Sequence, residues 1–444
     1  MRVSPVNWLE RVQWLLVGLI PVIAMHRYRE IIWRAPVVPV RTPAEFTGIV
    51  LFLVDYLMVA GLVIGVLRWL FDRDSARHFA STTEHVIRMR GGFIWVGLVV
   101  WMGLGTLWAY EPQLARYATL HTAGCLLIGF WIADIVRRGH QMPLLVVYVT
   151  GAAAHSALAL AQAAHSGEIG LDWLGEASQE FVSGSFRAYG LTDNPNSLGG
   201  YLVVALFASL ALLIQVTGDM NWKTGLAALA TVLIGFGLLT TLSRGAIAAT
   251  CVALIPLGIA GRGKYRQLAQ HHKLALGGLV LLPVIGGIVV FGPQLQGRLN
   301  EVTTDEWQQE RYYFNRNFYV ADTNAAIKES GPLGVGSNNL MIAIARLRLD
   351  AHGTLYPVHN VYWLIRAENG WPGLAIFLIA CAVTFMGVRW RTVSPSLAWG
   401  CGLMAVCLIM MVEFYFWASP HSVPLLFFAL GMIWGHGRIQ PRDG

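Results

Sequence analysis

The sequence predicts an all-α polytopic membrane protein of about twelve transmembrane helices. Hydrophobic residues make up 55% of its 444 positions and charged residues only 13%, whereas an ordinary soluble protein carries about 25% charged residues. Apolar runs of about 20 residues, the length that crosses a bilayer, recur from one end of the chain to the other. Basic residues gather between these runs, which is typical of the cytoplasmic loops of membrane proteins.

The apolar runs define the expected helices in order. We expect the first helix to be retained, because no small-residue cleavage site follows it. Ser243-Arg244-Gly245 interrupts a nearly continuous apolar stretch and separates the seventh helix from the eighth. Pro372 marks the start of the tenth, since proline is favoured at the first position of a helix. The expected spans are 11–27, 47–71, 92–110, 114–136, 142–165, 194–217, 223–242, 244–261, 273–292, 371–389, 396–418 and 421–437.

The charge pattern predicts which loops share a side of the membrane. With the N-terminus and C-terminus in the cytoplasm, most basic loops lie inside, as the positive-inside rule requires. The acidic loop 168–180 and the long loop 293–357 then lie on the opposite face. The segment from Arg27 to Arg41 is the exception, because its arginines would lie outside. We find no internal repeat, so residues 1–444 are expected to form a single membrane domain.

Composition also excludes several classes of function. The net charge of +7 is carried by short loops between apolar runs, which argues against nucleic acid as a partner. The cysteines form no CxxC pair and all fall inside apolar runs, so they predict neither a disulfide framework nor a zinc site; they are Cys125, Cys251, Cys381, Cys401 and Cys407. Asp72-Arg73-Asp74 forms a DxD sequence, the metal–diphosphate signature of many sugar transferases. It stands in a basic loop that we expect in the cytoplasm, so we interpret it as a solvated turn.

The region 293–370 is too long for a simple connection and is therefore expected to be functional. It shows helical spacing over 305–328, a break at Gly331–Gly336, and a short helix of its own over His359–Gly370. Arg311 stands in an aromatic stretch of this region, which suits a carbohydrate or an anionic headgroup. A solvated amphipathic helix would show the same pattern.

Two further arginines are candidates for anion binding. Arg187 precedes Asn194-Pro195-Asn196 at the entry to the sixth span, and Asn196 could hydrogen-bond a sugar or the loop itself. Arg244 follows Ser243 between two apolar segments, where a charge is a functional hypothesis by default. Arginine presents a planar fork suited to phosphate. The alternatives are a capped helix start for the first and a tight hairpin reaching headgroups for the second.

His359-Asn360 is the candidate for proton transfer. On a helix, His359 would share a face with Tyr362, Trp363 and Arg366, and a nearby positive charge would keep the imidazole neutral and able to accept a proton. Glu368 could pair with Arg366 or orient His359. A structural histidine is the alternative.

Taken in order, these motifs resemble the O-antigen ligase and polymerase superfamily of bacterial envelope enzymes. The resemblance is carried by Arg187–Asn196, Leu242–Gly245, Gly331–Asn339 and His359–Tyr362 with Glu368-Asn369-Gly370. It implies a GT-C type, inverting, metal-independent glycosyltransferase with no cofactor and no bound metal. Its active site would lie on the periplasmic face of the inner membrane, within the large periplasmic loop 293–370.

The resemblance also implies substrates and roles. The donor would be O-antigen polysaccharide on undecaprenyl diphosphate and the acceptor lipid A–core oligosaccharide. His359 would be the catalytic base, Arg187, Arg244 and Arg311 would bind the donor diphosphate, and Asn196 and Asn360 would contact substrate. The alternatives are an O-antigen polymerase, a protein O-oligosaccharyltransferase, or a transporter of a lipid-linked sugar, for which polar residues near the membrane midplane would be expected.

Overall fold

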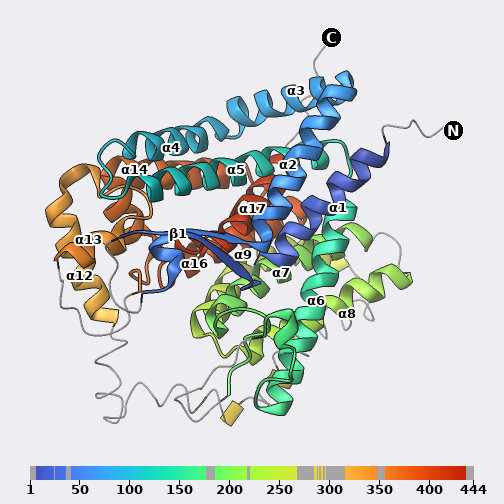
Figure 1. Ribbon diagram of the computed structural model, residues 1–444. Coiled ribbons are helices and arrows are strands. Elements are labelled where there is room, and N and C mark those ends of the chain that lie inside the picture. Colours follow the sequence, from blue (N-terminus) through green and yellow to red (C-terminus); the bar gives the residue numbers. More distant parts are fainter. Residues whose placement is uncertain are drawn as a thin grey trace.

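The computed structural model describes residues 7–24, 26–36, 42–176, 186–217, 221–267, 316–347 and 356–436, with a few positions between 285 and 296. Helices dominate the described chain (Figure 1). They are α1 (Asn7–Ile23), α2 (Leu53–Phe71), α3 (Arg73–Met89), α4 (Gly92–Gly105), α5 (Pro112–Arg137), α6 (Gln141–His165), α7 (Pro195–Val216), α8 (Trp222–Thr240), α9 (Arg244–Gln267), α12 (Arg316–Ser330), α13 (Leu340–Leu347), α14 (Val361–Met386), α15 (Pro395–Ile409), α16 (Tyr415–Ala418) and α17 (Val423–Gly435). Short 3₁₀ helices are η1 (Ala44–Phe46), η2 (Asp172–Leu174), η3 (Gly331–Leu333) and η4 (Pro420–Ser422).

The helical membrane architecture is confirmed, but the count of twelve spans is not established. Among the described residues, 7 helices are long and apolar enough to cross a bilayer, namely α2, α5, α6, α7, α8, α9 and α14. Helices α3 and α4, bent by 85° relative to each other, could supply an eighth. Helix α15 and the stretch Pro420–Gly435 are apolar but shorter. Most of the expected span 273–292 lies outside the described residues.

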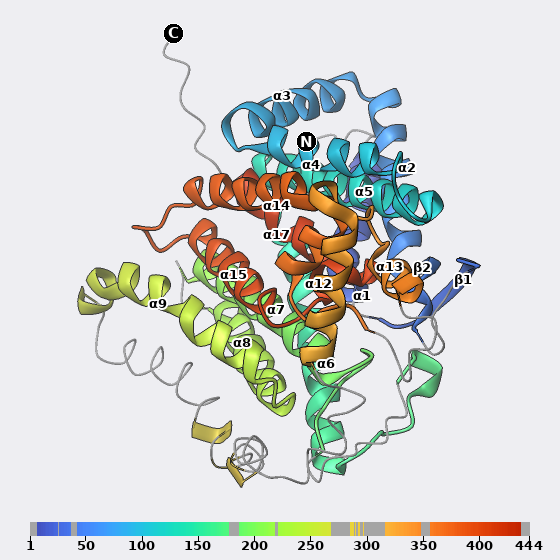
Figure 2. The same ribbon diagram turned by 90° about the vertical axis from the view of Figure 1, so that its left-hand side faces the viewer.

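The core of the molecule is built by helices that are apolar on every side. Every residue of α17 is buried, and so is most of α7. A helix that is hydrophobic all round is expected in the interior, whereas a membrane helix at the periphery exposes one apolar face to lipid. Figure 2 shows α14 and α15 in front of α17 and α7. This packing gives α15, α16 and their connection a fixed place beside the start of α14.

A two-stranded sheet departs from the all-α expectation. Strand β1 (Arg29–Arg34) pairs antiparallel with β2 (Gly48–Phe52), with Arg29 opposite Phe52 and Arg34 opposite Gly48. The side chains of β2 alternate between buried and half-buried, a pattern of period two that fits a strand and not a helix. The expected span 47–71 therefore begins only at Leu53. The segment between the strands carries η1, whose residues are buried.

Helix α14 is interrupted where the sequence predicts a new helix to begin. Gly370 has φ 70° and ψ −172°, a conformation outside the helical region, and Pro372 follows in the second part of the helix. The first part, which starts at Val361, corresponds to the short helix expected over His359–Gly370. In Figure 1, α12 and α13 lie beside this start of α14, at the opposite side of the molecule from α3.

Candidate functional site

His359 lies just before α14 and not on it. Asn360 is the N-cap of the helix, so the face that the sequence predicts His359 to share with Tyr362, Trp363 and Arg366 does not exist. The imidazole is half-buried; it stacks on the Tyr319 ring at 5.6 Å and meets the Phe414 ring edge-on at 4.8 Å. Burial raises the pKa of Tyr319 to about 12, so its phenol stays protonated near neutral pH. Two aromatic walls therefore fix the plane of the histidine.

Asn360 anchors the start of α14. Its side-chain oxygen accepts a hydrogen bond from the backbone N–H of Trp363 at 3.0 Å, and its side-chain nitrogen donates to the Met411 carbonyl at 3.1 Å. The backbone N–H of Val361 also donates to the Met410 carbonyl at 2.8 Å. These bonds tie the His359 segment to the connection between α15 and α16. Asn360 thus has a helix-capping role here, and contact with substrate stays a prediction.

Arg187 and Asn196, which the sequence nominates together, are in direct contact. The Arg187 side chain donates from Nε to the Thr241 carbonyl at 3.0 Å and from NH2 to Asn196 Oδ1 at 2.6 Å. Asn196 in turn donates from Nδ2 to Glu413 Oε1 at 2.9 Å. A charge-assisted bond to an oriented amide fixes the direction of the guanidinium fork. The Glu413 carboxylate holds that amide in place. We call these three hydrogen-bonded residues, Arg187, Asn196 and Glu413, the relay.

Arg244 stands next to this relay. It is the first residue of α9, it is exposed, and it follows a tight turn over Thr241–Ser243 that contains Leu242 with φ 48°. The neighbouring Gly245 approaches Val412 so closely that an added Cβ would lie 3.1 Å from Cγ2 of Val412. The start of α9 therefore lies against the residue that precedes Glu413. An arginine at a helix N-terminus can bind an anion through its own charge, and the free backbone N–H groups of the first turn can bind the same anion.

The connection between α15 and α16 joins the two halves of the site. Glu413 binds the Arg187–Asn196 pair, and the adjacent Phe414 packs against His359. The dipeptide Glu413-Phe414 therefore connects the candidate base, His359, with the candidate anion-binding residue Arg187. Glu413 was missed in the sequence, where it stands inside an expected span. A lone carboxylate in an apolar run is itself a signal of function, and that signal could have found it.

The β1–β2 segment supplies a third side of this region. Arg29 forms ion pairs with Glu45 at 2.7 Å and with Asp193 at 3.6 Å, the latter just before the N-cap of α7. Phe46 meets the Phe414 ring edge-on at 5.5 Å. Burial and the nearby Asp193 raise the pKa of Glu45 to about 7, against the opposing effect of Arg29. The arginine-rich segment that disagrees with the charge rule thus packs beside the candidate site, where Arg29 pairs with carboxylates.

Several other polar residues of the described chain make their contacts outside this cluster. Arg311 lies outside the described residues. Arg346 binds at the start of α5, through the Tyr110 carbonyl at 3.2 Å and Glu111 at 3.8 Å. Tyr362 donates to the Cys407 carbonyl and Trp363 to the side chain of Asn324, so these two side chains diverge.

The expectation that Glu368 pairs with Arg366 or orients His359 is wrong. Its carboxylate accepts a hydrogen bond from the backbone N–H of Leu340 at 3.4 Å, where α13 begins. Its backbone carbonyl accepts from the N–H of Gly336 at 2.8 Å. The first N–H groups of a helix have no internal acceptor and attract a carboxylate. Glu368 therefore holds the Gly331–Asn339 segment against α14.

A small polar pocket lies behind Glu368. Its interior volume is about 40 Å³, which is room for a few water molecules. Its polar lining comes from Tyr117, His121, Thr122, Ser337, Asn338 and Glu368. Since His121 also binds Asp55 at 2.9 Å, the pocket is lined by groups that already serve the packing of α5 and α14.

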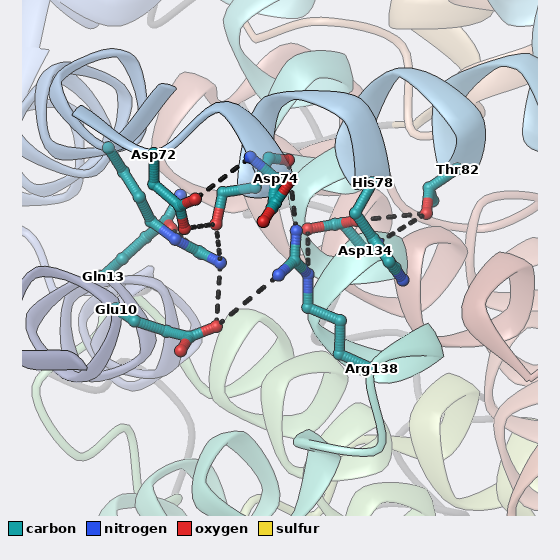
Figure 3. Close-up of polar contacts among 10 residues, drawn as sticks. Glu10, Gln13, Asp72, Asp74, His78, Thr82, Asp134 and Arg138 are labelled. Carbon is teal, nitrogen blue, oxygen red and sulfur yellow. Dashed lines mark hydrogen bonds and ion pairs between the residues drawn. The ribbon is translucent and has the colours of Figure 1, made fainter. Parts of the chain in front are cut away.

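A second polar cluster lies among α1, α2, α3 and α5 (Figure 3). Asp72 accepts hydrogen bonds from the Asp74 backbone at 3.1 Å and from the Ser75 hydroxyl at 2.6 Å, so it caps α3 and is not the solvated turn residue expected. His78 and Arg138 both bind Asp134. This cluster joins helices. In the part of the chain that the structure describes, no three His, Cys, Asp or Glu side chains are grouped so that they could hold a metal ion.

A family model matches part of the chain. Residues 229–378 match the family model described as O-antigen ligase. The match covers about a third of the chain, from within α8 to within the second part of α14, and includes Arg244 and His359. Arg187, Asn196 and Glu413 lie outside it. No curated protein sequence matches the chain.

Proposed function

Residues 229–378 identify the chain as a member of the O-antigen ligase superfamily, and on this premise we propose that it is an O-antigen ligase. It transfers O-antigen polysaccharide from undecaprenyl diphosphate to lipid A–core oligosaccharide on the periplasmic face of the bacterial inner membrane. The reaction inverts the anomeric centre, follows the GT-C type, and needs neither metal nor cofactor. The single observation that supports this most is that Glu413, which binds Asn196 of the Arg187–Asn196 pair, is followed in the chain by Phe414, whose ring packs against His359.

The chemistry of this transfer needs two functions from the protein. The acceptor hydroxyl oxygen attacks the anomeric carbon while the bond from that carbon to the phosphate oxygen breaks. His359 takes the hydroxyl proton, a task suited to an imidazole near neutral pH. Undecaprenyl diphosphate leaves with the bonding electrons, and its growing negative charge faces Arg187 and Arg244. Fixed positive groups at the site of developing charge stabilise such a transition state.

The relay of Arg187, Asn196 and Glu413 supplies the positional accuracy that this stabilisation needs. A guanidinium that already points at the leaving group does not have to reorganise during the reaction. Two of its donor positions are held by Thr241 and Asn196, so its orientation is set before the donor arrives. Arg311 is proposed as a third diphosphate ligand, and Asn360 as a substrate contact, on the resemblance of their motifs alone.

Two related activities are alternatives within the superfamily. An O-antigen polymerase would use an undecaprenyl-linked acceptor, and a protein O-oligosaccharyltransferase would use a protein. A transporter of lipid-linked sugar is less favoured, because the two nominated arginines that the structure describes, Arg187 and Arg244, lie together where α7 and α9 begin and not along a path through the helices.

Reconstitution distinguishes these activities. The purified protein is incubated with undecaprenyl-linked glycan and rough lipopolysaccharide in the presence of EDTA. The ligase proposal expects polymer on lipid A–core. Longer undecaprenyl-linked chains instead indicate the polymerase, and glycosylated protein indicates the third activity. Activity that appears only after a divalent metal is added contradicts metal independence.

A further inference from the structure

Arg366 is a buried cation with no counter-charge among the residues that the structure describes. It lies one turn before the break in α14 and is 6% exposed. Its guanidinium stands 4.6 Å from the centre of the Trp371 ring and donates to the Gly331 carbonyl over a long 3.4 Å. Its Nε is buried without a hydrogen-bond acceptor. Among the residues that the structure describes, no carboxylate lies within ion-pair distance of it.

Arg68 shows how this protein satisfies a buried arginine elsewhere. Its side chain is 5% exposed and forms an ion pair with Glu10 at 2.8 Å. It also donates to Gln13 and to Ser75, each at 2.8 Å. Buried charges are normally paired and hydrogen-bonded in this way, because an isolated ion is expensive outside water. Within the described part of the chain, Arg366 has none of these charged or side-chain acceptors.

A second donor without an acceptor lies on the same side of α14. Asn369 is 3% exposed, and its Nδ2 is buried without a partner, while its Oδ1 accepts from the Ser337 hydroxyl at 2.7 Å. Residues three apart on a helix are neighbours on its surface. Arg366 and Asn369 both adjoin the segment Gly331–Asn339. Two buried donors one turn apart, with no acceptor, favour an external acceptor that carries negative charge.

Exposed apolar side chains stand on both segments that Arg366 contacts. Trp371 is 56% exposed and begins the apolar second part of α14, and Leu333 on η3 is 42% exposed. Tryptophan is enriched at the level of lipid headgroups, between hydrocarbon and water. The negative groups that are abundant at this level are phosphates, and the planar arginine fork binds phosphate with two parallel hydrogen bonds.

We propose that Arg366, stacked on Trp371, forms a binding site for the phosphate ester of a lipid at the membrane surface. The site is separate from the Arg187–Asn196–Glu413 relay, since its contacts come from η3 and Trp371 and not from α7, α9 or the α15–α16 connection. A bulk phospholipid and a phosphorylated glycolipid offer the same phosphate chemistry. The proposal does not depend on the glycosyl transfer proposed above, because lipid binding can be measured without turnover.

The first test uses thermal stability in an uncharged detergent. Arg366→Leu removes a charge that lacks a partner, so the variant is expected to be at least as stable as the parent protein without phospholipid. Addition of phosphatidylglycerol should then raise the melting temperature of the parent but not that of Arg366→Leu. Arg68→Leu is the matched control, because it strips Glu10 of its partner and should destabilise the protein with and without lipid.

The second test separates the possible lipids by direct binding. Phosphatidylglycerol, phosphorylated lipid A, dephosphorylated lipid A and an uncharged glycosyl diacylglycerol are titrated against the parent, Arg366→Leu and the exposed-site variant Trp371→Ala. Binding of both phosphorylated lipids, weakened at least tenfold in Arg366→Leu and to a smaller extent in Trp371→Ala, supports a general headgroup site. Binding of phosphorylated lipid A alone with the same losses supports a glycolipid site.

Two results overturn the proposal. One is equal affinity of the parent and Arg366→Leu for every phosphorylated lipid. The other is loss of stability of Arg366→Leu in uncharged detergent, comparable with that of Arg68→Leu, because it would mean that protein groups already satisfy Arg366.

Discussion

At the scale of single residues, the two aromatic neighbours of His359 hold its imidazole in one orientation, as a general base requires. Its ring is held between Tyr319 and Phe414 and remains half-buried. An aromatic cage fixes the plane of the imidazole before a substrate hydroxyl binds. Because His359, Tyr319 and Phe414 come from three separate segments, their geometry depends on the assembly of the whole site.

His359→Ala should abolish transfer in the reconstituted assay while leaving the protein folded. General base catalysis typically contributes about 10²–10⁴-fold in rate, so at least this loss is expected in kcat. The melting temperature checks that the cavity left between Tyr319 and Phe414 is tolerated. His165→Ala, at an exposed position at the end of α6, should keep full activity. Normal transfer by His359→Ala contradicts the assignment of the base.

Glu413 acts on the donor through Asn196 and Arg187, which makes it a positioning residue. Glu413→Ala frees the Asn196 amide, and the KM for the donor should rise about tenfold, the loss expected from one hydrogen bond to a charged group. Glu413→Gln can still accept from Asn196 and should recover most of the affinity. The KM for the acceptor should not change.

Glu84→Ala, which removes an exposed carboxylate on α3, is the matched control for Glu413. A fall in kcat with both KM values unchanged would argue against a positioning role. So would equal damage from Glu413→Ala and Glu413→Gln.

Glu45 should make stability depend on pH near the site. Its pKa is raised to about 7 by burial and by Asp193, so the folded state holds a proton that the unfolded state releases at lower pH. Stability from this group is therefore present at about pH 4.5 and is lost as pH rises through about 7. Glu45→Gln keeps the neutral form, so its melting temperature relative to the parent should increase from pH 5 to pH 8. A difference that is constant over this range contradicts the shift.

At the scale of elements, the break in α14 is held by backbone packing. Gly334 has φ 81° and Gly370 has φ 70°. A Cβ at Gly334 would clash with the Glu368 carbonyl, and one at Gly370 with the Pro332 carbonyl. Glycine is needed at both positions for conformation and for space. The break lets the first part of α14 carry the His359 segment at an angle independent of the membrane span that follows.

Gly370→Ala should disturb this arrangement. A backbone with positive φ and ψ near 180° is essentially restricted to glycine and costs an alanine about 1–3 kcal/mol, and the clash with Pro332 adds to it, so both melting temperature and transfer activity should fall. Gly97→Ala in α4, where an added Cβ meets nothing within 4 Å, should be neutral or slightly stabilising. Equal behaviour of the two variants would show that the break does not need glycine.

At the scale of the whole molecule, the positions of α3 and α12 make the proposed topology testable. The two helices lie at opposite sides of the molecule in Figure 1. Single cysteines at the exposed positions Ser81 on α3, Asp172 in η2 and Lys328 on α12 are introduced into a protein whose native cysteines are replaced by serine.

An impermeant thiol reagent should label Asp172→Cys and Lys328→Cys in intact spheroplasts. It should label Ser81→Cys only after the membrane is opened. Labelling of Ser81→Cys in intact cells would reverse the proposed orientation. Labelling of Asp172→Cys and Lys328→Cys on different sides would contradict the expected pairing of their loops.

Prediction from the sequence was most successful where the signal is local. The apolar runs gave α5, α6 and α7 within a few residues, because span length and hydropathy depend on each segment alone. The break before Pro372 followed from a proline and a glycine. The β1–β2 pair was missed, since its short strands are masked by the apolar run that continues into α2.

The contacts within the site could be anticipated only in part. The pairing of Arg187 with Asn196 joins residues that are close in sequence, so a local motif could indicate it. The bond from Asn196 to Glu413 joins residues 217 positions apart, and nothing in either segment encodes it. The role of Glu368 was wrongly assigned because a carboxylate can satisfy a helix start as well as a neighbouring arginine.

The sequence by itself determined that this is a helical membrane protein with a histidine and several arginines placed outside its apolar runs. Tertiary structure decided which of them meet. In a membrane helix, the faces toward lipid and toward other helices are both apolar, so the pattern of residues does not reveal its neighbours. The site depends on those neighbours, because Glu413 and Phe414 reach Asn196 and His359 only once α7, α14 and α15 have packed around α17.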